Sequence, residues 1–228
     1  MAEIPERYAP DPLAPLEIRG ERQVFREHGG ADFTVTAIDT SVRKTGKSLT
    51  LHVASVKDAQ PGAVCIAVRP AAPGNTNVGN ANDVDAFAGI DSCQILLARH
   101  WRASTGKWEW EFPRGMGEPG ENAEQTAARE FREETGIAVD ASCVRTLQTM
   151  HADTGVLRDN IAVTYFPVST DTETAGETDG ELSNFVWIGI KQMRHLIADG
   201  QLVDGITLAS FMVFIAHLSA RAEESKAR

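Results

Sequence analysis

The sequence predicts an α+β fold, a sandwich of strands and helices around one core, preceded by an N-terminal antiparallel β meander. Alternating apolar and polar residues at 33–38 and 48–54 indicate half-buried strands, joined by a turn at 44–47. Apolar residues at helical spacing in 206–222 indicate an amphipathic helix. A hydrophobic content of 42% over 228 residues is ordinary for one generous globular domain with an extension.

The chain divides by composition into an arm, a strand-rich segment and a main domain. Residues 1–16 are polar and proline-rich, and we expect a flexible arm there. Strand patterns fill 17–60, and the main domain is expected at 61–222. Within it, residues 69–92 are rich in Gly, Asn and Ala and predict an inserted surface loop. The charged tail is expected at 223–228.

Within the main domain, apolar runs and alternating patterns predict strands, with a helix in the acidic motif and two more helices at the C-terminal end. The strands are expected at 62–68, 94–99, 108–112, 144–150, 161–168 and 185–188, and the two C-terminal helices at 190–199 and 206–222.

The charge of the chain excludes one class of partner. The net charge is −10, and no cluster of Lys and Arg offsets it, so the surface should repel nucleic acid. The acidic residues concentrate at 109–134 and 171–181, which points to cation binding. A small anionic substrate remains compatible if a divalent cation or a local set of arginines receives it.

Cysteine usage and hydropathy indicate a cytoplasmic protein. The three cysteines, Cys65, Cys93 and Cys143, are widely spaced and odd in number, which argues against a disulfide framework or a zinc site and fits a reducing compartment. No apolar run approaches the roughly 18–20 residues of a membrane span. Residues 1–16 lack the apolar region of a secretory signal, so we expect no membrane association.

The stretch 110–137 carries the chemistry. Glu130, Glu133 and Glu134 stand at positions i, i+3 and i+4 of the predicted helix, so their carboxylates share one face. Three like charges on a face are destabilising unless a partner neutralises them. Mg²⁺ or Mn²⁺ would do so, because hard divalent cations prefer carboxylate oxygens.

Other residues of this stretch support the same reading. Arg129 lies four residues before Glu133 and can pair with it. We expect Glu121 in the first turn of the helix, where its charge suits the helix dipole. The glycines of the predicted turn 113–117 bring bare backbone close to a ligand, so a carbonyl of this turn can complete a metal shell.

The spacing of these residues resembles the signature of the Nudix hydrolases. The resemblance implies an α/β/α sandwich around a mixed sheet. It also implies an Mg²⁺-dependent (or Mn²⁺-dependent) hydrolase that splits a nucleoside diphosphate linked to another moiety. The matching positions, between residues 115 and 137, are Gly115, Glu121, Arg129, Glu130, Phe131, Glu133, Glu134, Gly136 and Ile137.

The resemblance also assigns roles within the signature. It implies that Glu130 and Glu134 bind the metal directly and that Glu133 binds it directly or through water. The carbonyl of Arg114 is a further expected ligand. Arg129 would orient the glutamates and is therefore grouped with Glu133 among the candidate catalytic residues, whereas Glu121 would support the loop and helix.

More weakly, the chain resembles the ADP-ribose pyrophosphatase branch of this family. The stretches 97–102, 110–113 and 200–209 carry that likeness. The N-terminal strands fit too, because the branch uses an N-terminal sheet to build a homodimer. The chain departs from the branch where Asp153 stands near an expected proline, and where Arg114 replaces a small residue. An arginine beside the phosphate site changes which leaving group fits.

The remaining roles fall on less constrained residues. Branch enzymes take their base from an acidic loop well after the signature, which here is the loop 169–181, and Glu177 and Glu181 are the candidates, with Asp179 third. For substrate binding we expect Arg102 first. The other groups that can stack a base or hold phosphates are Trp101, Arg99, Trp108, Trp110 and Arg158.

The resemblance leaves alternatives open on the substrate and on activity itself. Diadenosine polyphosphates, oxidised nucleoside triphosphates and dinucleotides are other substrates that such a site accepts. A non-catalytic nucleotide-sensing module is a different class of function, although sensors tend to lose the carboxylates that this chain keeps. An isomerase on the same fold is a more remote alternative.

Overall fold

The computed structural model describes residues 14–29, 32–71, 93–170, 172, 174 and 182–226. The chain divides into two compact units, which we describe separately. The first comprises Met1–Ala59 and Asp153–Arg158, and the second comprises Gln60–Ala152 and Asp159–Arg228.

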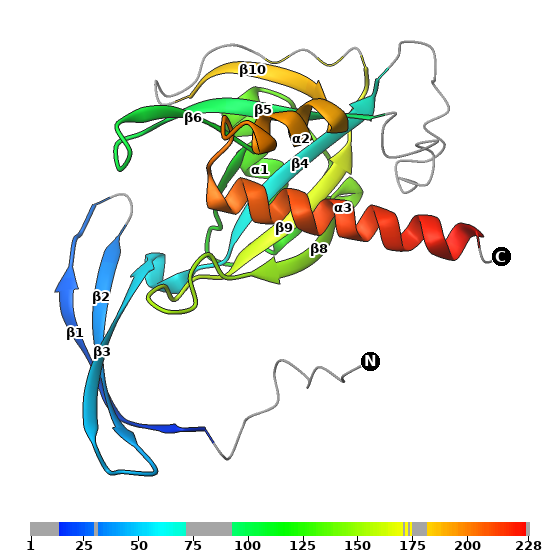
Figure 1. Ribbon diagram of the computed structural model, residues 1–228. Coiled ribbons are helices and arrows are strands. Elements are labelled where there is room, and N and C mark those ends of the chain that lie inside the picture. Colours follow the sequence, from blue (N-terminus) through cyan, green and yellow to red (C-terminus); the bar gives the residue numbers. More distant parts are fainter. Residues whose placement is uncertain are drawn as a thin grey trace. The chain divides into compact units, whose positions relative to one another are not determined.

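The first unit contains the antiparallel meander that the alternating patterns predicted (Figure 1). Its strands are β1 (Leu16–Arg26), β2 (Phe33–Val42) and β3 (Ser48–Val56), and β2 lies in the middle. The segment 153–158 adds to the edge of β3 through a parallel bridge between Ala54 and Leu157.

The second unit is built on a seven-stranded mixed sheet with the order β10-β5-β4-β9-β8, in which β6 pairs with β5 and β7 pairs with β4. The central strands β4 and β9 are parallel, and the other pairs are antiparallel. The strands are β4 (Gly62–Pro70), β5 (Cys93–Arg102), β6 (Lys107–Glu111), β7 (Arg114–Met116), β8 (Arg145–Met150), β9 (Ile161–Pro167) and β10 (Leu182–Gly189).

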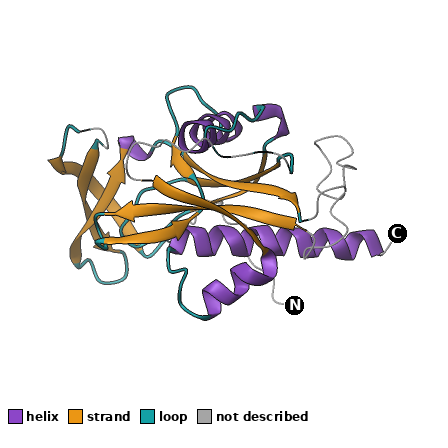
Figure 2. Cartoon of the chain, turned by 90° about the horizontal axis from the view of Figure 1, so that it is seen from above, coloured by secondary structure: helices purple, strands orange, loops and turns teal. Residues whose placement is uncertain are grey.

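Helices cover both faces of this sheet, which confirms the predicted α/β/α sandwich (Figure 2). Alternate residues of β4 are buried on opposite faces, as expected for a central strand. Val64 and Ile66 belong to the core on the face covered by α2 (Ile190–Ala198) and α3 (Gly205–Lys226). Ala63 and Cys65 pack with the side of α1 (Ala123–Thr135), where small side chains let the helix approach the sheet closely.

The sheet separates where the signature begins. Strands β4 and β5 pair only at Val68–Ile95, Arg69–Gln94 and Pro70–Cys93. Further along, β7 pairs with the start of β4, and β6 pairs with the end of β5. The prediction of a turn at 113–117 was therefore wrong in part, because residues 114–116 are extended and form β7.

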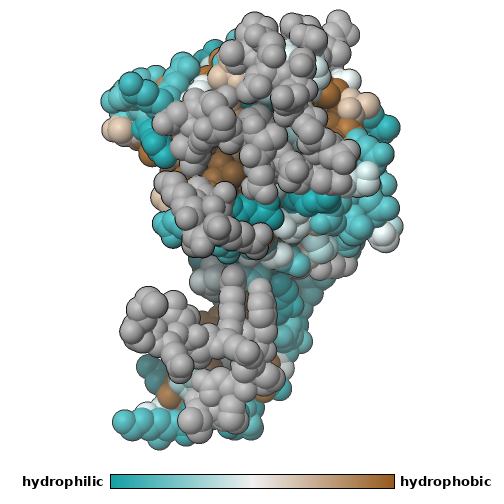
Figure 3. Space-filling model, turned by 90° about the vertical axis from the view of Figure 1, so that its right-hand side faces the viewer, coloured by the Kyte–Doolittle hydropathy of each residue, from teal (hydrophilic) through white to brown (hydrophobic). Residues whose placement is uncertain are grey.

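Two further features of the second unit bear on the predictions. The helix α3 extends to Lys226, through residues that were expected to form a frayed tail. Most of the expected insertion, residues 72–92, lies outside the described residues. The face shown in Figure 3 is mainly hydrophilic where it is described, with small apolar patches. Among the described helices, none is long and apolar enough to cross a membrane.

Candidate metal and catalytic site

The helix α1 begins and ends at residues that the sequence pattern marks. Asn122 caps the N-terminus: its side chain accepts a hydrogen bond from the Gln125 N–H, and the Gln125 side chain accepts one from the Asn122 N–H. Gly136 ends the helix with φ of 75°, a left-handed conformation that favours glycine. Ala127 and Phe131 are fully buried against the sheet, and the glutamates at 130, 133 and 134 lie on the neighbouring face of α1.

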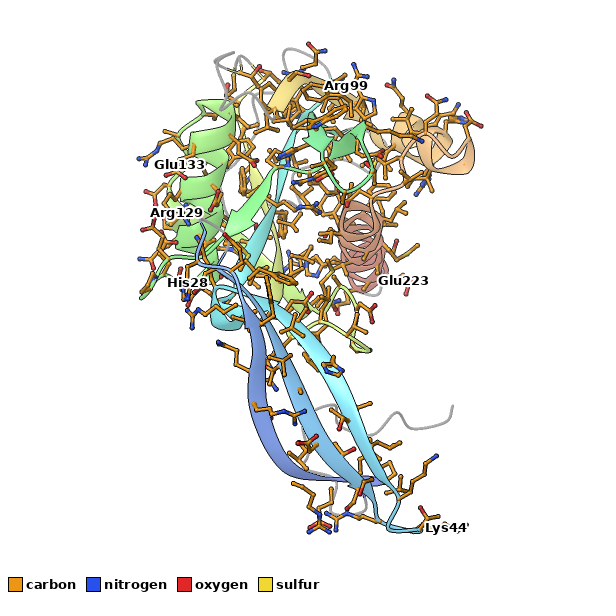
Figure 4. All side chains as sticks on the ribbon, turned by 90° about the vertical axis from the view of Figure 1, so that its left-hand side faces the viewer. His28, Lys44, Arg99, Arg129, Glu133 and Glu223 are labelled. Carbon is orange, nitrogen blue, oxygen red and sulfur yellow. The ribbon has the colours of Figure 1, made fainter. Side chains whose placement is uncertain are left out.

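Arg129 is the centre of the acidic side of α1. Its Nε and Nη2 donate to the two oxygens of Glu121 at 2.8 and 2.9 Å, and Nη1 donates to Glu130 Oε1 at 2.8 Å and to Glu133 Oε2 at 3.0 Å. Nη2 also donates to the Met116 carbonyl at 2.8 Å, which ties the helix to the end of β7. The predicted pair with Glu133 is therefore present, and Figure 4 shows both side chains next to each other on α1.

Glu121 lies outside the helix, so its prediction in the first turn was wrong. It precedes the cap residue Asn122, and its carboxylate accepts hydrogen bonds from Arg129, from the Glu118 N–H at 2.9 Å and from the Thr126 hydroxyl at 3.1 Å. The hydrogen bonds from Arg129 are the main cause that lowers the pKa of Glu121 to about 2. Glu121 is thus a charged brace between the loop and α1, in keeping with its expected supporting role.

Gly115 leaves room beside the backbone of β7 for the Glu130 carboxylate. A Cβ at this position would lie 2.0 Å from the Glu130 carboxyl carbon, so any side chain would displace that carboxylate. Gly115 is paired with Ala63 of β4, and the strand therefore cannot move away to make room. The glycine holds the Glu130 carboxylate against the backbone of β7.

Glu134 is a partly buried carboxylate of the α1 face. Its Oε2 accepts a hydrogen bond from the Arg114 N–H at 3.1 Å. The pKa of Glu134 is raised to about 8, mainly by burial and in part by the neighbouring Glu130 carboxylate, and the Arg114 N–H and the charges of Arg102 and Arg114 limit the rise. A buried carboxylate with a pKa this high lacks sufficient positive charge nearby.

We call Glu121, Arg129, Glu130, Glu133 and Glu134 the glutamate cluster. Its donors are carboxylate oxygens, which suit Mg²⁺ or Mn²⁺, and the buried, under-compensated Glu134 fits a site that receives a cation. In the part of the chain that the structure describes, no three His, Cys, Asp or Glu side chains form a ready-made metal shell. Glu130 and Glu133 are instead directed to Arg129, so metal binding requires these side chains to turn.

A second set of charges, which the sequence reading missed, lies where the sheet separates. Glu111 is 1% exposed, accepts from Arg102 at 2.8 and 2.5 Å, and forms an ion pair with Arg114 at 2.7 Å. Arg114 also pairs with Asp204 at 2.9 Å. We call Arg102, Glu111, Arg114 and Asp204 the Arg114 network.

The network includes two residues predicted for other reasons. Arg102, expected to bind substrate, uses its Nε and Nη2 on Glu111. Arg114 was expected to contribute a carbonyl, and its guanidinium now has acidic partners on two sides. Glu111 alternates with Trp110 and Phe112 in the sequence and therefore resembles a solvent-facing strand residue. The one available signal was its place at the end of that strand, directly before the signature.

Of the other predicted binding residues, Arg99 and Trp101 lie on β5 at positions that alternate with Arg102, Trp108 and Trp110 lie on β6, and Arg158 belongs to the first unit. Trp101 packs edge-to-face on Trp108 of β6, with ring centroids 5.7 Å apart, and Arg99 lies over the Trp108 ring at 5.7 Å. In Figure 4, Arg99 lies on the strands, away from Arg129 and Glu133 on α1. The structure thus does not bring these side chains together with the glutamate cluster. The candidate bases Glu177 and Glu181, with Asp179, lie outside the described residues.

Comparison with known proteins agrees with this geometry. A family model described as the NUDIX domain matches residues 82–209, more than half of the 228 residues. The RNA pyrophosphohydrolase of Pseudoalteromonas atlantica (strain T6c / ATCC BAA-1087) is 40% identical over 58 residues, which are 25% of this chain and 33% of that protein. The chain therefore matches about a third of the length of this relative.

Among solved structures, the crystal structure of an ADP compounds hydrolase has a similar fold. The TM-score is 0.64 at 17% sequence identity, and the match covers 90% of this chain and 95% of that one. At this identity the likeness concerns the fold.

Proposed function

Because the chain belongs to the Nudix family of hydrolases, we propose that it cleaves the diphosphate of ADP-ribose or of a related nucleoside diphosphate sugar with Mg²⁺, or Mn²⁺, as cofactor. The products would be a nucleoside monophosphate and a sugar phosphate. The observation that carries this proposal is the glutamate cluster, in which three carboxylates surround Arg129 and a fourth, that of Glu134, accepts from the backbone of the glycine-containing strand β7.

The chain's own residues prepare the site for a cation and a diphosphate. Glu130, Glu133, Glu134 and the Arg114 carbonyl would hold the cation, which supplies charge neutralisation on the phosphoryl oxygens and activates water. Arg129 restrains the carboxylates before binding. Glu134, with a pKa of about 8, must lose its proton to act as a ligand, and a neighbouring cation favours that loss.

The general base is expected in the loop 169–181, where Glu177 and Glu181 remain the candidates. Exchange of each for Gln tests this assignment separately. Loss of one acid–base group costs roughly 10²–10⁴ in rate, so the true base should show a loss of that size at saturating metal. A loss below threefold for both variants would move the role to another residue, with Asp179 next.

Substrate contacts are expected from β5 and β6. Trp101 is 39% exposed, so part of its ring is available to stack a base. Arg99 and Arg102 carry the positive charge of the same strand, although Arg102 is already paired with Glu111. An increase in KM for Trp101→Ala at constant kcat would support stacking, and an unchanged KM would remove it from the binding site.

A homodimer is the expected assembly. The three-stranded sheet of the first unit carries large apolar side chains in exposed positions, which in a monomer would remain in contact with water. These residues are Ile18, Val24, Phe25, Phe33 and Leu51. Light scattering after gel filtration should give twice the chain mass of 24.7 kDa, and the variant Ile18→Ser/Phe25→Ser should shift it toward the monomer.

A second candidate function is removal of pyrophosphate from RNA. The 40% identity to an RNA pyrophosphohydrolase over 58 residues favours it, and the net charge of −10 opposes it, because RNA binding depends on positive surface charge. ADP-ribose is therefore preferred, on the basis of the fold likeness to an ADP compounds hydrolase and the acidic surface.

One substrate panel separates these proposals. The purified protein is incubated with Mg²⁺ and, in turn, with ADP-ribose, a diadenosine polyphosphate, an oxidised nucleoside triphosphate, a dinucleotide and a 5′-triphosphorylated RNA, and the products are identified by chromatography. AMP and ribose 5-phosphate from ADP-ribose at the highest kcat/KM supports the first proposal. Preference for the RNA supports the second, and binding without turnover of any compound supports a nucleotide sensor.

A further inference from the structure

The main chain and the side chain of Arg114 contact different charged groups. The main-chain N–H donates to Glu134 of the glutamate cluster at 3.1 Å. The guanidinium belongs to the Arg114 network and lies between Glu111 and Asp204. Any force that holds the side chain therefore also restrains the backbone beside Glu134.

Acidic partners hold the guanidinium from two sides. Nη2 forms an ion pair with Glu111 Oε2 at 2.7 Å, and Nη1 and Nη2 donate to the two oxygens of Asp204 at 2.9 and 3.4 Å. The Arg114 and Asp204 side chains are only 17% and 15% exposed, so water screens these charges weakly. Although burial alone would raise the pKa of Asp204, the charge of Arg114 and hydrogen bonds from Thr207 hold it below its ordinary value.

The backbone around Arg114 is fixed to β4 on one side only. The Pro113 carbonyl accepts from the Cys65 N–H at 2.8 Å, and the Gly117 N–H donates to the Pro61 carbonyl at 2.8 Å. Between them Arg114 directs its N–H away from β4 and toward Glu134. In a strand, the N–H and C=O of one residue point to the same side, so the Arg114 carbonyl also faces the glutamates.

Asp204 connects this segment to the start of α3. Its Oδ2 accepts from the Thr207 N–H at 2.8 Å, and its carbonyl accepts from the Leu208 N–H at 3.0 Å, so it caps the helix. The Thr207 hydroxyl accepts from the Phe112 N–H at 3.1 Å. The residues before β7 are thus anchored to a long helix that packs on the sheet.

We propose that Asp204 is a positioning residue for the metal site, acting through the Arg114 guanidinium to fix the Arg114 backbone and the Glu134 carboxylate beside it. This inference rests on the proposed metal role of Glu134 and of the Arg114 carbonyl. It assigns a function to the arginine that replaces a small residue before the signature. It also predicts that a change at the N-terminus of α3 weakens cation binding at α1.

The variant Asp204→Asn tests the inference selectively. Asn keeps a side-chain oxygen for the Thr207 N–H, so the helix cap persists, but it loses the charge that holds Arg114. Loss of an outer partner of a metal ligand costs about 10-fold to 100-fold in metal affinity. We expect Mn²⁺ affinity, measured by electron paramagnetic resonance without substrate, to fall about 10-fold, with an unchanged KM for substrate at saturating metal.

A matched control is Asp32→Asn, which makes the same exchange in the Arg26–Asp32 pair of the first unit (2.6 and 2.8 Å). Asp32 has φ of 42°, a conformation that Asn tolerates. Mn²⁺ affinity should equal that of the wild type. If Asp204→Asn does not fold, the double variant Arg114→Met/Asp204→Asn keeps Arg102 paired with Glu111, and it should fold and still bind Mn²⁺ weakly.

The possible outcomes separate the inference from the proposed function. Wild-type Mn²⁺ affinity in a folded Asp204→Asn or double variant would overturn the positioning role. A raised KM with unchanged Mn²⁺ affinity would also overturn it and assign Arg114 to the substrate. A wild-type protein that neither binds Mn²⁺ nor hydrolyses any compound of the panel would overturn the proposed function, and the inference with it.

Discussion

The glutamate cluster and the Arg114 network meet at one residue, Arg114, yet they differ in charge balance. The cluster sets four carboxylates against one arginine. The network sets two arginines against two carboxylates. A balanced, buried set of charges needs no further partner, whereas an excess of carboxylates is stable only when a cation joins it. Charge balance thus distinguishes a structural ion network from a site that binds a cation.

Removal of the Glu134 carboxylate should have the largest effect on activity. Glu134→Gln keeps the shape of the side chain but removes its negative charge. We expect the protein to fold normally and to lose roughly 10²–10⁴ in Mg²⁺-dependent hydrolysis, the range for one essential carboxylate. Initial rates with ADP-ribose at saturating Mg²⁺ measure this.

The control for that variant is Glu124→Gln on the same helix. Glu124 is in the first turn and accepts a hydrogen bond from the Thr146 hydroxyl, outside the glutamate cluster, so its rate should stay within twofold of the wild type. Wild-type turnover in Glu134→Gln would show that the cluster does not bind the catalytic metal.

A break in the Arg114 network should instead reduce stability. Glu111→Ala removes the buried carboxylate that two arginines share and leaves the partly buried Arg102 without this partner. Loss of one member of a buried pair costs roughly 3–5 kcal/mol. Chemical denaturation at pH 7 should show a fall of this size in the free energy of unfolding.

The neighbouring variant Glu109→Ala provides the comparison, because Glu109 accepts a hydrogen bond from the exposed Thr105 at a partly exposed position of the same strand. It should change stability by less than about 1 kcal/mol. An equal loss of stability in both variants would mean that any truncation in β6 destabilises the protein, and that the charge balance of the network is not the cause.

Arg129 contributes both to stability and to the geometry of the site. It ties Glu121 and the end of β7 to α1, and it holds Glu130 and Glu133 in place. Lys in its place keeps the charge but cannot donate to four partners in the same plane. We expect Arg129→Lys to lower kcat/KM about 10-fold to 100-fold, the range for partners that orient metal ligands. Arg132→Lys, an exposed change on the same helix, should leave kcat/KM unaltered, and an equal loss there would contradict the assignment.

Much of the glutamate cluster could be predicted because its geometry is local. The spacing of Glu130, Glu133 and Glu134 along one helix fixes their common face, and the pair of Arg129 with Glu133 follows from the same spacing. The strands of the meander followed from their alternation. The prediction for Glu121 was wrong because Asn122 caps the helix, so that α1 begins at Ala123, two residues after Glu121.

The Arg114 network could not be predicted because its geometry is not local. Arg114 and Asp204 are far apart in the sequence, and their contact depends on how α3 enters the fold. Glu111 follows a strand alternation that normally faces solvent, and it is buried because β4 and β5 separate beside it. The periodicity of a sequence does not reveal where two strands of a sheet separate, so a charged residue at that place looks like a surface residue.

The difference in charge balance also predicts how pH acts on the glutamate cluster. Without metal, the pKa of Glu134 is about 8, above the ordinary value of 4.5 for a glutamate. Below pH 8 the carboxyl is protonated, so cation binding must release a proton. The apparent affinity for Mn²⁺ should therefore rise about tenfold per pH unit from pH 6 to pH 8 and level off above it.

The same pKa sets the stability of the metal-free protein. Because the folded pKa is raised, the stabilising contribution of Glu134 is complete below its unfolded pKa, falls as pH rises from 4.5, and is lost above 8. The loss should amount to a few kcal/mol. Glu134→Gln has no charge to bury, so without metal at pH 8 it should unfold at higher denaturant concentration than the wild type, despite its expected loss of activity. Equal midpoints at pH 8 would show that Glu134 is already compensated, and the glutamate cluster would then resemble the balanced Arg114 network.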